Sequence, residues 1–183
     1  MVWAIKSDDD KAILQEIEHQ TDRGAALIAT AYLEERLVDA IKARLVQDKN
    51  IESAFFKGIG PLANFSARID LGYLLGIYEK KAHRLFLTVK DIRNRFAHRA
   101  EPLEFTTQKI NDLCRNVDIS VTALWKAPHP ETGEIIKISI VLKPDGTPKT
   151  AFFNCVQFLL FSLDMEIKMM PPRKPAPPVM PPM

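Results

Sequence analysis

The sequence predicts an all-α protein, a helical bundle of about six helices that leaves room for one small β-hairpin near residues 134–149. Three observations favour this fold class. Apolar residues recur at the 3.6-residue spacing of a helix over long stretches, the chain holds only seven glycines, and its 46% hydrophobic and 26% charged residues are typical of a soluble globular protein. In a chain of 183 residues we expect one helical domain over residues 1–170 and a proline-rich disordered tail at 171–183.

The first half of the chain predicts three helical segments. The first runs from about Thr21 to Val46, with Asp22 as its capping residue. A shorter amphipathic segment leads up to Phe56, and the Gly-Ile-Gly-Pro run at 58–61 then ends it and turns the chain. The third segment, capped by Asn64 or Ser66 and ending at Gly76, is apolar on nearly all sides, so we expect it to be central.

The second half predicts two helices, a stretch of different character and a last helix. From Glu79 to about Arg99 a core-facing stripe recurs, and Thr106 or Thr107 can cap a fifth helix. The isoleucine-rich stretch that follows has little helical spacing and precedes a Pro-Asp-Gly turn at 144–146, which suggests the hairpin. A last helix, about Thr150 to Lys168, is hydrophobic on most of its surface and should pack into the bundle or a partner.

Charge and cysteine content exclude several function classes. A formal charge of +2 is far below that of proteins that bind nucleic acid through phosphate contacts alone, so such a partner must meet a local patch. Cys114 and Cys155 lack metal-ligand spacing, so we expect reduced thiols, no metal and no cofactor. No signal sequence or membrane span is evident. We therefore expect a cytoplasmic protein.

The known enzyme motifs are absent, with one partial exception. The Gly58–Ala63 run formally fits a dinucleotide fingerprint, but helix-like sequence precedes it and Pro61 removes an amide that would face the phosphates, so a turn between helices is favoured. No phosphate-binding loop with Gly-Lys-Ser/Thr, nucleophile elbow or zinc-protease motif occurs.

The segment from Lys90 to His98 is the best candidate for chemistry. On a helix, Asp91, Asn94 and His98 fall on one line opposite the core stripe, while Arg93 sits about 140° around from His98. His98 could move a proton, Asn94 could orient it, and Arg93 could hold a phosphate during cleavage of a phosphodiester without metal. The alternative is a solvated helix face or a structural hydrogen-bond cluster.

The same predicted helix carries the most basic face of the chain. Seven Lys or Arg residues stand against two acids between Glu79 and Arg99. An RNA or DNA backbone would be contacted by such a face. The candidate nucleic-acid-binding residues are Lys80, Lys81, Arg84, Arg95 and Arg99.

Charged residues also interrupt otherwise apolar helices. Buried charges need partners, so we expect Arg68 to pair with Glu34 or Glu35, and Arg23 to find a partner near the start of the first helix. A structural network is the favoured interpretation and a functional site is the alternative. The members of this charged cluster are Arg23, Glu34, Glu35, Arg68, Asp70 and Asp91.

Three ordered stretches of this sequence resemble the mannitol operon repressor family. They are TDRGAALIATAYLEERL at 21–37, FKGIGPLANFSARIDLGY at 56–73 and DIRNRFAH at 91–98, followed by DLC at 112–114. The resemblance spans about residues 20 to 115 and implies an all-helical fold and a role in transcriptional repression. It does not extend over the last 60 residues.

Arg93, Asn94 and His98 also look like the Arg-to-His motif of the HEPN superfamily, helical dimers that often cleave RNA without metal. The lead hypothesis is a transcriptional regulator acting through partner or nucleic-acid contacts. The alternative is a HEPN-type endoribonuclease that uses Arg93 and His98 across a homodimer. A helical interaction module without nucleic-acid contacts is a third hypothesis. The expected partners are a second copy of the chain and DNA, RNA or a regulatory protein.

Overall fold

The structure is a computed structural model that describes residues 12–13, 15–17, 19–99, 101–117, 123–128, 135–140 and 146–169. Within these ranges the bounded elements are six helices, α2 (Asp22–Arg44), α3 (Lys49–Phe56), α4 (Phe65–Leu74), α5 (Lys80–His98), α6 (Gln108–Arg115) and α7 (Pro148–Met169), and two strands, β1 (Ala123–Pro128) and β2 (Ile135–Ile140). The predicted all-α class is confirmed. The proline-rich tail predicted at 171–183 lies outside the described residues.

The hairpin is present but begins earlier in the chain than predicted. β1 and β2 are antiparallel, with Ala123 opposite Ile140 and Pro128 opposite Ile135. β2 therefore pairs with an upstream strand, and residues 144 and 145 of the predicted Pro-Asp-Gly turn lie outside the described residues. The predicted fifth helix is α6, which ends at Arg115, and Ala123–Pro128 forms β1. Of the helices with defined bounds, none packs against the strands.

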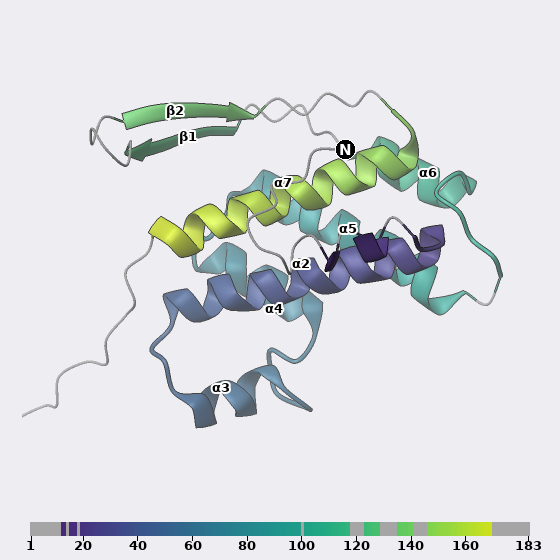
Figure 1. Ribbon diagram of the computed structural model, residues 1–183. Coiled ribbons are helices and arrows are strands. Elements are labelled where there is room, and N and C mark those ends of the chain that lie inside the picture. The colour runs from purple at the N-terminus through teal and green to yellow at the C-terminus, as the bar shows by residue number, and fades with distance from the viewer. Residues whose placement is uncertain are drawn as a thin grey trace, which may run out of the picture.

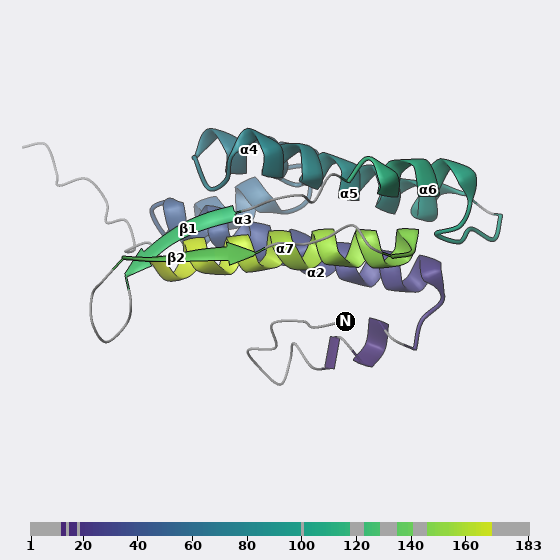
Figure 2. The same cartoon turned by 90° about the horizontal axis from the view of Figure 1, so that it is seen from above.

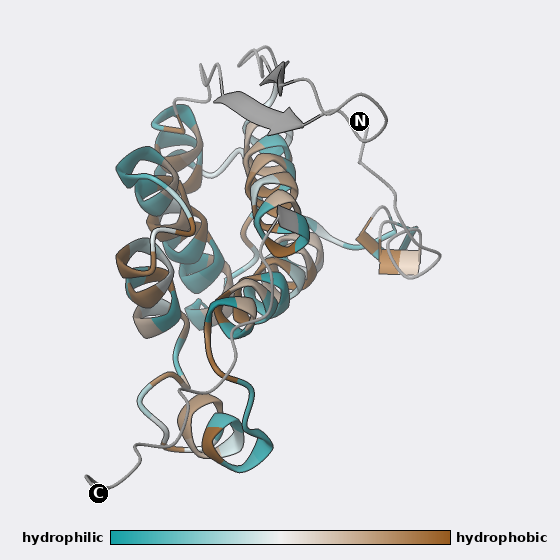
Figure 3. Ribbon diagram, turned by 90° about the vertical axis from the view of Figure 1, so that its left-hand side faces the viewer, coloured by the Kyte–Doolittle hydropathy of each residue, from teal (hydrophilic) through white to brown (hydrophobic). Residues whose placement is uncertain are grey.

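The helices form two layers (Figures 1 and 2). α2 and α7 lie side by side in one layer and run parallel, while α4, α5 and α6 make the other layer. α5 runs antiparallel to α2. The end of α5 lies at the start of α2, where the carbonyl of Arg99, just beyond α5, accepts a hydrogen bond from Arg23. α3 stands apart below both layers and is the separate coil at the bottom of Figure 3.

Ion pairs join α2 and α7 along their length. Lys149 pairs with Asp22 at 2.9 Å near the beginning of both helices, and Arg36 pairs with Asp164 at 2.6 Å farther along. Arg44 pairs with Glu166 at the far end. All three contacts cross more than 120 residues of sequence, so the first and last helices are bound to each other along one side of the bundle.

The core lies between the layers and is rich in phenylalanine. Phe105, in the connection between α5 and α6, is 1% exposed and has ring centroids 5.1 Å from Phe96, 5.2 Å from Phe152 and 5.9 Å from Phe153. These rings join both layers at one end of the bundle. The predicted stripe on α5 is also buried, at Leu85, Val89, Ile92 and Phe96.

α7 owes its apolar character to this core. Among the described helices it alone is long and apolar enough to cross a membrane, but half of that apolar stretch is buried inside the bundle. Phe152, Phe153, Val156, Leu159 and Leu163 are all fully buried. The bundle therefore covers the buried half of the apolar surface of α7, which we expected either the bundle or a partner to cover.

Two details of the predicted elements are wrong. Thr21, not Asp22, caps α2, since its side chain accepts a hydrogen bond from the amide of Gly24 at 3.2 Å. Asp22 instead accepts from the amide of Phe105 and from Lys149. α4 begins at the predicted cap Asn64 but is peripheral, because Asp70 is exposed and Leu74 is 78% exposed.

Candidate functional site

The predicted catalytic residues lie in the last two turns of α5 but do not converge. The guanidinium of Arg93 is half-buried and donates to the side-chain oxygen of its neighbour Asn94 at 3.0 Å. His98 is exposed and forms no hydrogen bond or ion pair with any described residue. Asp91 is exposed as well and lies 3.7 Å from the Lys90 ammonium. One chain thus presents the His98 imidazole on its surface, while the Arg93 guanidinium is bound to Asn94.

The candidate nucleic-acid-binding residues border two hollows between α5 and α6. One hollow, of about 430 Å³, is lined by Lys80, Lys81, Arg84, Leu85 and Asn116. The other, of about 290 Å³, is lined by Arg95 and Arg99 from the α5 side, by the start of α6 including Lys109, and by Glu101, Leu103 and Ile110. α6 runs back along α5, so the hollows lie at opposite ends of one surface. We call this surface the basic groove.

Arg68 is the centre of the predicted charged cluster and contacts both α2 and the chain between α3 and α4. Its guanidinium pairs with Glu34 of α2 at 2.6 Å and donates to three backbone carbonyls, those of Leu62 at 2.7 Å, Phe56 at 3.0 Å and Ala63 at 3.2 Å. The Arg68 side chain is only 13% exposed. It therefore ties α4 to α2 and fixes both ends of the segment that follows α3.

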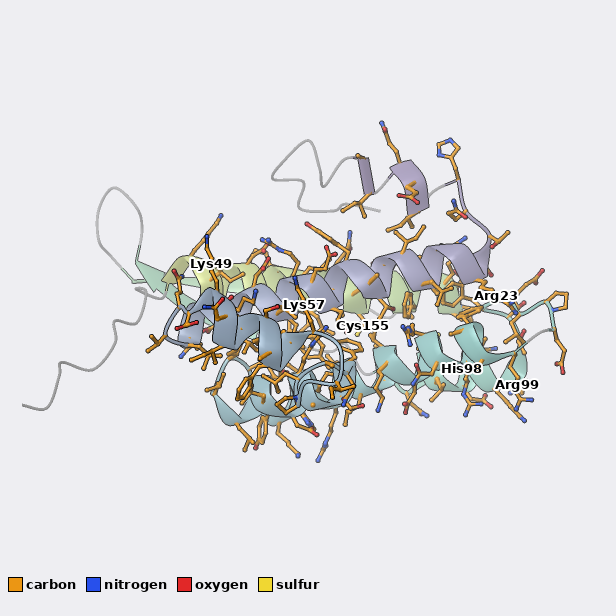
Figure 4. The ribbon with its side chains drawn as sticks, turned by 90° about the horizontal axis from the view of Figure 1, so that it is seen from below. Arg23, Lys49, Lys57, His98, Arg99 and Cys155 are labelled. Atoms are coloured by element: carbon orange, nitrogen blue, oxygen red, sulfur yellow. The ribbon has the colours of Figure 1, made fainter. Side chains whose placement is uncertain are left out.

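Apart from Glu34, the other members of the cluster do not pair with Arg68. Arg23 bonds the carbonyls of Arg99 and Glu101, not a carboxylate, and so anchors the chain after α5 to the start of α2 (Figure 4). Glu35 is exposed and forms no ion pair with the described residues. The Arg68–Glu34 pair and the other four residues thus lie at different places, and the six do not form one site.

Sequence analysis missed a contact between Asp70 of α4 and His83 of α5. The imidazole Nε2 of His83 lies 2.8 Å from the carboxylate of Asp70, and the ring packs 5.1 Å from that of Tyr73. Among the described residues no partner faces its buried Nδ1. Next to it, Tyr78 donates to the carbonyl of Ile69, and burial raises the pKa of the Tyr78 hydroxyl. Asp70 and His83 are 13 positions apart on two different helices, so the periodicity of a single helix does not predict their contact.

A second feature missed from the sequence is the α3 projection, which we define as residues 46–61. Of the five large apolar residues of the described chain that are strongly exposed, four lie here. Phe55 is 46% exposed, Ile51 is 59% exposed, and Ile59 is completely exposed between two glycines; the fourth is Val46. Lys49 and Lys57 lie on the same projection (Figure 4), are exposed and form no ion pair with described residues.

The α3 projection is rigidly attached to the body. Phe56 is buried, Lys42 of α2 pairs with Glu52 at 3.0 Å, and the amide of Leu62 bonds the carbonyl of Phe55. Gly60 is required there, because a Cβ at that position would lie 2.2 Å from the carbonyl oxygen of Ala54. A fixed backbone thus presents the exposed apolar residues.

The thiols are buried and do not form a reactive site. Burial raises the pKa of Cys114 to about 12 and raises that of Cys155 further, which leaves almost no thiolate near neutral pH. Within the described ranges, no three His, Cys, Asp or Glu side chains are grouped as metal ligands.

Comparison with known proteins shows what this architecture resembles. No protein-family model and no curated protein matches the chain. A solved structure does: the MtlR chain in the X-ray structure of the MtlR–HPr complex from Escherichia coli superposes with a TM-score of 0.59 at 14% sequence identity, over 85% of this chain and 97% of that one. The resemblance expected from the three sequence stretches is confirmed at the level of the fold. This chain has the fold of MtlR.

Proposed function

We propose that this protein is a regulator that works by binding a partner protein through the α3 projection. One observation carries the proposal: four strongly exposed large apolar residues lie on the α3 projection, within 14 residues of the chain. Apolar side chains concentrated on a surface in this way are typical of protein interfaces. The shared fold with MtlR, which is found in a complex with HPr, supports a partner-binding role for this chain too.

The charged residues of the α3 projection indicate which kind of partner it would bind. Lys49 and Lys57 flank the apolar residues, and Glu52 is already neutralised by Lys42. The favoured partner is therefore a protein with an apolar patch edged by carboxylates.

Titration calorimetry with E. coli HPr, using the full chain, tests this function. We expect micromolar binding, weakened about tenfold or more by Phe55→Ser with Ile59→Ser. Leu74→Ser is the control, because Leu74 is also strongly exposed, at 78%, but lies on α4, and it should bind like the wild type. Absence of binding at about 100 µM refutes an HPr-like partner, and equal binding by all variants refutes the α3 projection as the interface.

The second candidate function is a metal-independent ribonuclease. The exposure of His98, which has no described partner, favours it, since such an imidazole is available to a substrate or to a second chain. Because Arg93 is held by Asn94 on another side of α5, cleavage requires a two-fold homodimer that supplies the second set of residues. RNA cleavage that resists chelator and disappears in both His98→Ala and Arg93→Ala would establish this activity; without it the regulator is favoured.

A further inference from the structure

The distribution of unpaired positive charge is uneven in this protein. Cations that face the interior of the bundle are neutralised, as for Arg36, Arg44 and Arg68, each of which has a carboxylate partner. In contrast, five cations along the basic groove have no carboxylate partner within the part of the chain that the structure describes. These are Lys80, Arg84, Arg95, Arg99 and Lys109.

Both hollows of the basic groove combine charge with an apolar surface. Leu85, which is 5% exposed, lines the hollow of Lys80 and Arg84, while half-buried Leu103 and buried Ile110 line that of Arg95, Arg99 and Lys109, together with Glu101. Their volumes, about 430 and 290 Å³, are near those of small-ligand pockets. A nucleotide matches this combination, because its phosphate can contact the cations and its base the apolar side chains.

The spacing of the hollows indicates a chain of nucleotides. From Lys81 to Arg99, α5 advances about 27 Å at 1.5 Å per residue, which corresponds to about eight stacked nucleotides at 3.4 Å each and to fewer in an extended strand. Asp91 and Asp112 lie between the two ends and are exposed. Phosphates are therefore expected to contact the two ends of the groove and not its middle.

We propose that the basic groove binds single-stranded nucleic acid, with at least one nucleotide in each hollow. A duplex fits less well, because its paired bases cannot enter separate hollows and only its phosphates would touch the protein. This inference goes beyond the proposed function and uses a different surface, since the basic groove shares no residue with the α3 projection.

Fluorescence anisotropy with labelled oligonucleotides of 4, 8 and 16 residues, as RNA and as DNA, tests the proposal. We expect the 8- and 16-residue strands to bind at low salt and the 4-residue strand to bind at least ten times more weakly, since it cannot span both hollows. About five phosphate contacts predict a slope of roughly −3.5 in log K against log salt. The RNA and DNA arms identify which strand is preferred, and either satisfies the proposal.

Three double variants remove two positive charges each. Lys80→Gln with Arg84→Gln and Arg95→Gln with Lys109→Gln should each weaken binding at least fivefold and flatten the salt slope by about 1.4. Lys49→Gln with Lys57→Gln on α3 is the matched control and should change binding less than twofold. All six substituted side chains are exposed, so the variants should fold.

Four results would overturn the proposal: no binding by any strand at about 100 µM protein, equal weakening by the control, tighter binding of a duplex, or full displacement by an aspartate octapeptide at equal charge. The last result would identify an acidic protein segment as the occupant. Failure of HPr binding leaves this test unaffected, so the two proposals fail separately.

Discussion

Replacing Arg68 by alanine tests how the α3 projection is fixed. The substitution removes one ion pair and three hydrogen bonds to carbonyls, and it leaves the carboxylate of Glu34 only 21% exposed without its partner. Breaking a fully buried pair costs about 3–5 kcal/mol. Since water can reach both partly exposed side chains, we expect the low end of that range, about 3 kcal/mol.

The assay is equilibrium unfolding in urea, followed by far-ultraviolet circular dichroism. The midpoint should fall at an unchanged m-value, and the melting temperature should drop by about 6–12 °C for a chain of this length. Arg68→Lys keeps the charge for Glu34 but cannot reach all three carbonyls, so its loss should be intermediate. A double-mutant cycle with Glu34→Gln isolates the ion pair, for which we expect a coupling of about 1–2 kcal/mol.

The same variant has a functional consequence. Because Arg68 holds Phe56 and Ala63, its loss should loosen the α3 projection and weaken the partner binding proposed for it, even at a temperature where the protein remains folded. A loss of stability below about 1 kcal/mol, which is the range of an exposed ion pair, would refute the reasoning. So would an α3 projection whose amide hydrogen exchange does not change.

Three other predictions follow from the core and the tail. Phe105→Ala should cost about 3–5 kcal/mol in urea unfolding, since Phe105 joins three other rings; a loss below about 1 kcal/mol contradicts that packing. Burial raises the pKa of Cys114 to about 12 and also raises that of Cys155. Stability is therefore complete below the unfolded thiol pKa of about 8.5 and falls above it, by up to about 1.4 kcal/mol per pH unit for each thiol. Urea unfolding between pH 8 and 10.5 measures this, and Cys114→Ala with Cys155→Ala should flatten the decline. Deletion of the residues after Met170 should leave the melting temperature unchanged, because a proline-rich segment offers no apolar stripe; a drop of several degrees would show that the tail packs.

Helix positions were predictable because periodicity reports burial on a single element. The stripe on α5 and the cap at Asn64 are both local patterns, and both are present. The prediction of Asp22 as the cap of α2 was wrong, because the side chains of Thr21 and Asp22 can both cap a helix. Contacts with Phe105 and Lys149 occupy the Asp22 carboxylate, so the Thr21 hydroxyl caps the helix.

Contacts between elements were harder to predict. The pairing of Arg68 with an acid of the first helix could be anticipated, because a charge within an apolar helix needs a partner. Its three carbonyl contacts could not, because they depend on how the chain turns after α3. The exposed apolar residues of the α3 projection could not be assigned either, since an amphipathic pattern at Ile51 and Phe55 does not say whether its apolar face is covered. The isolated Ile59 between two glycines was the available signal.

The parallel pairing of α2 with α7 has a consequence for synthesis in the cell. The apolar residues of α2, among them Leu33, Leu37 and Ile41, are fully buried in the finished protein, and α7 covers part of that helix. On a ribosome α2 emerges more than 100 residues before α7 begins. Contacts so distant in sequence form slowly, so the nascent chain exposes the part of α2 that α7 covers until α7 has been synthesised. Chaperone dependence and sensitivity to premature termination are the expected costs of this topology.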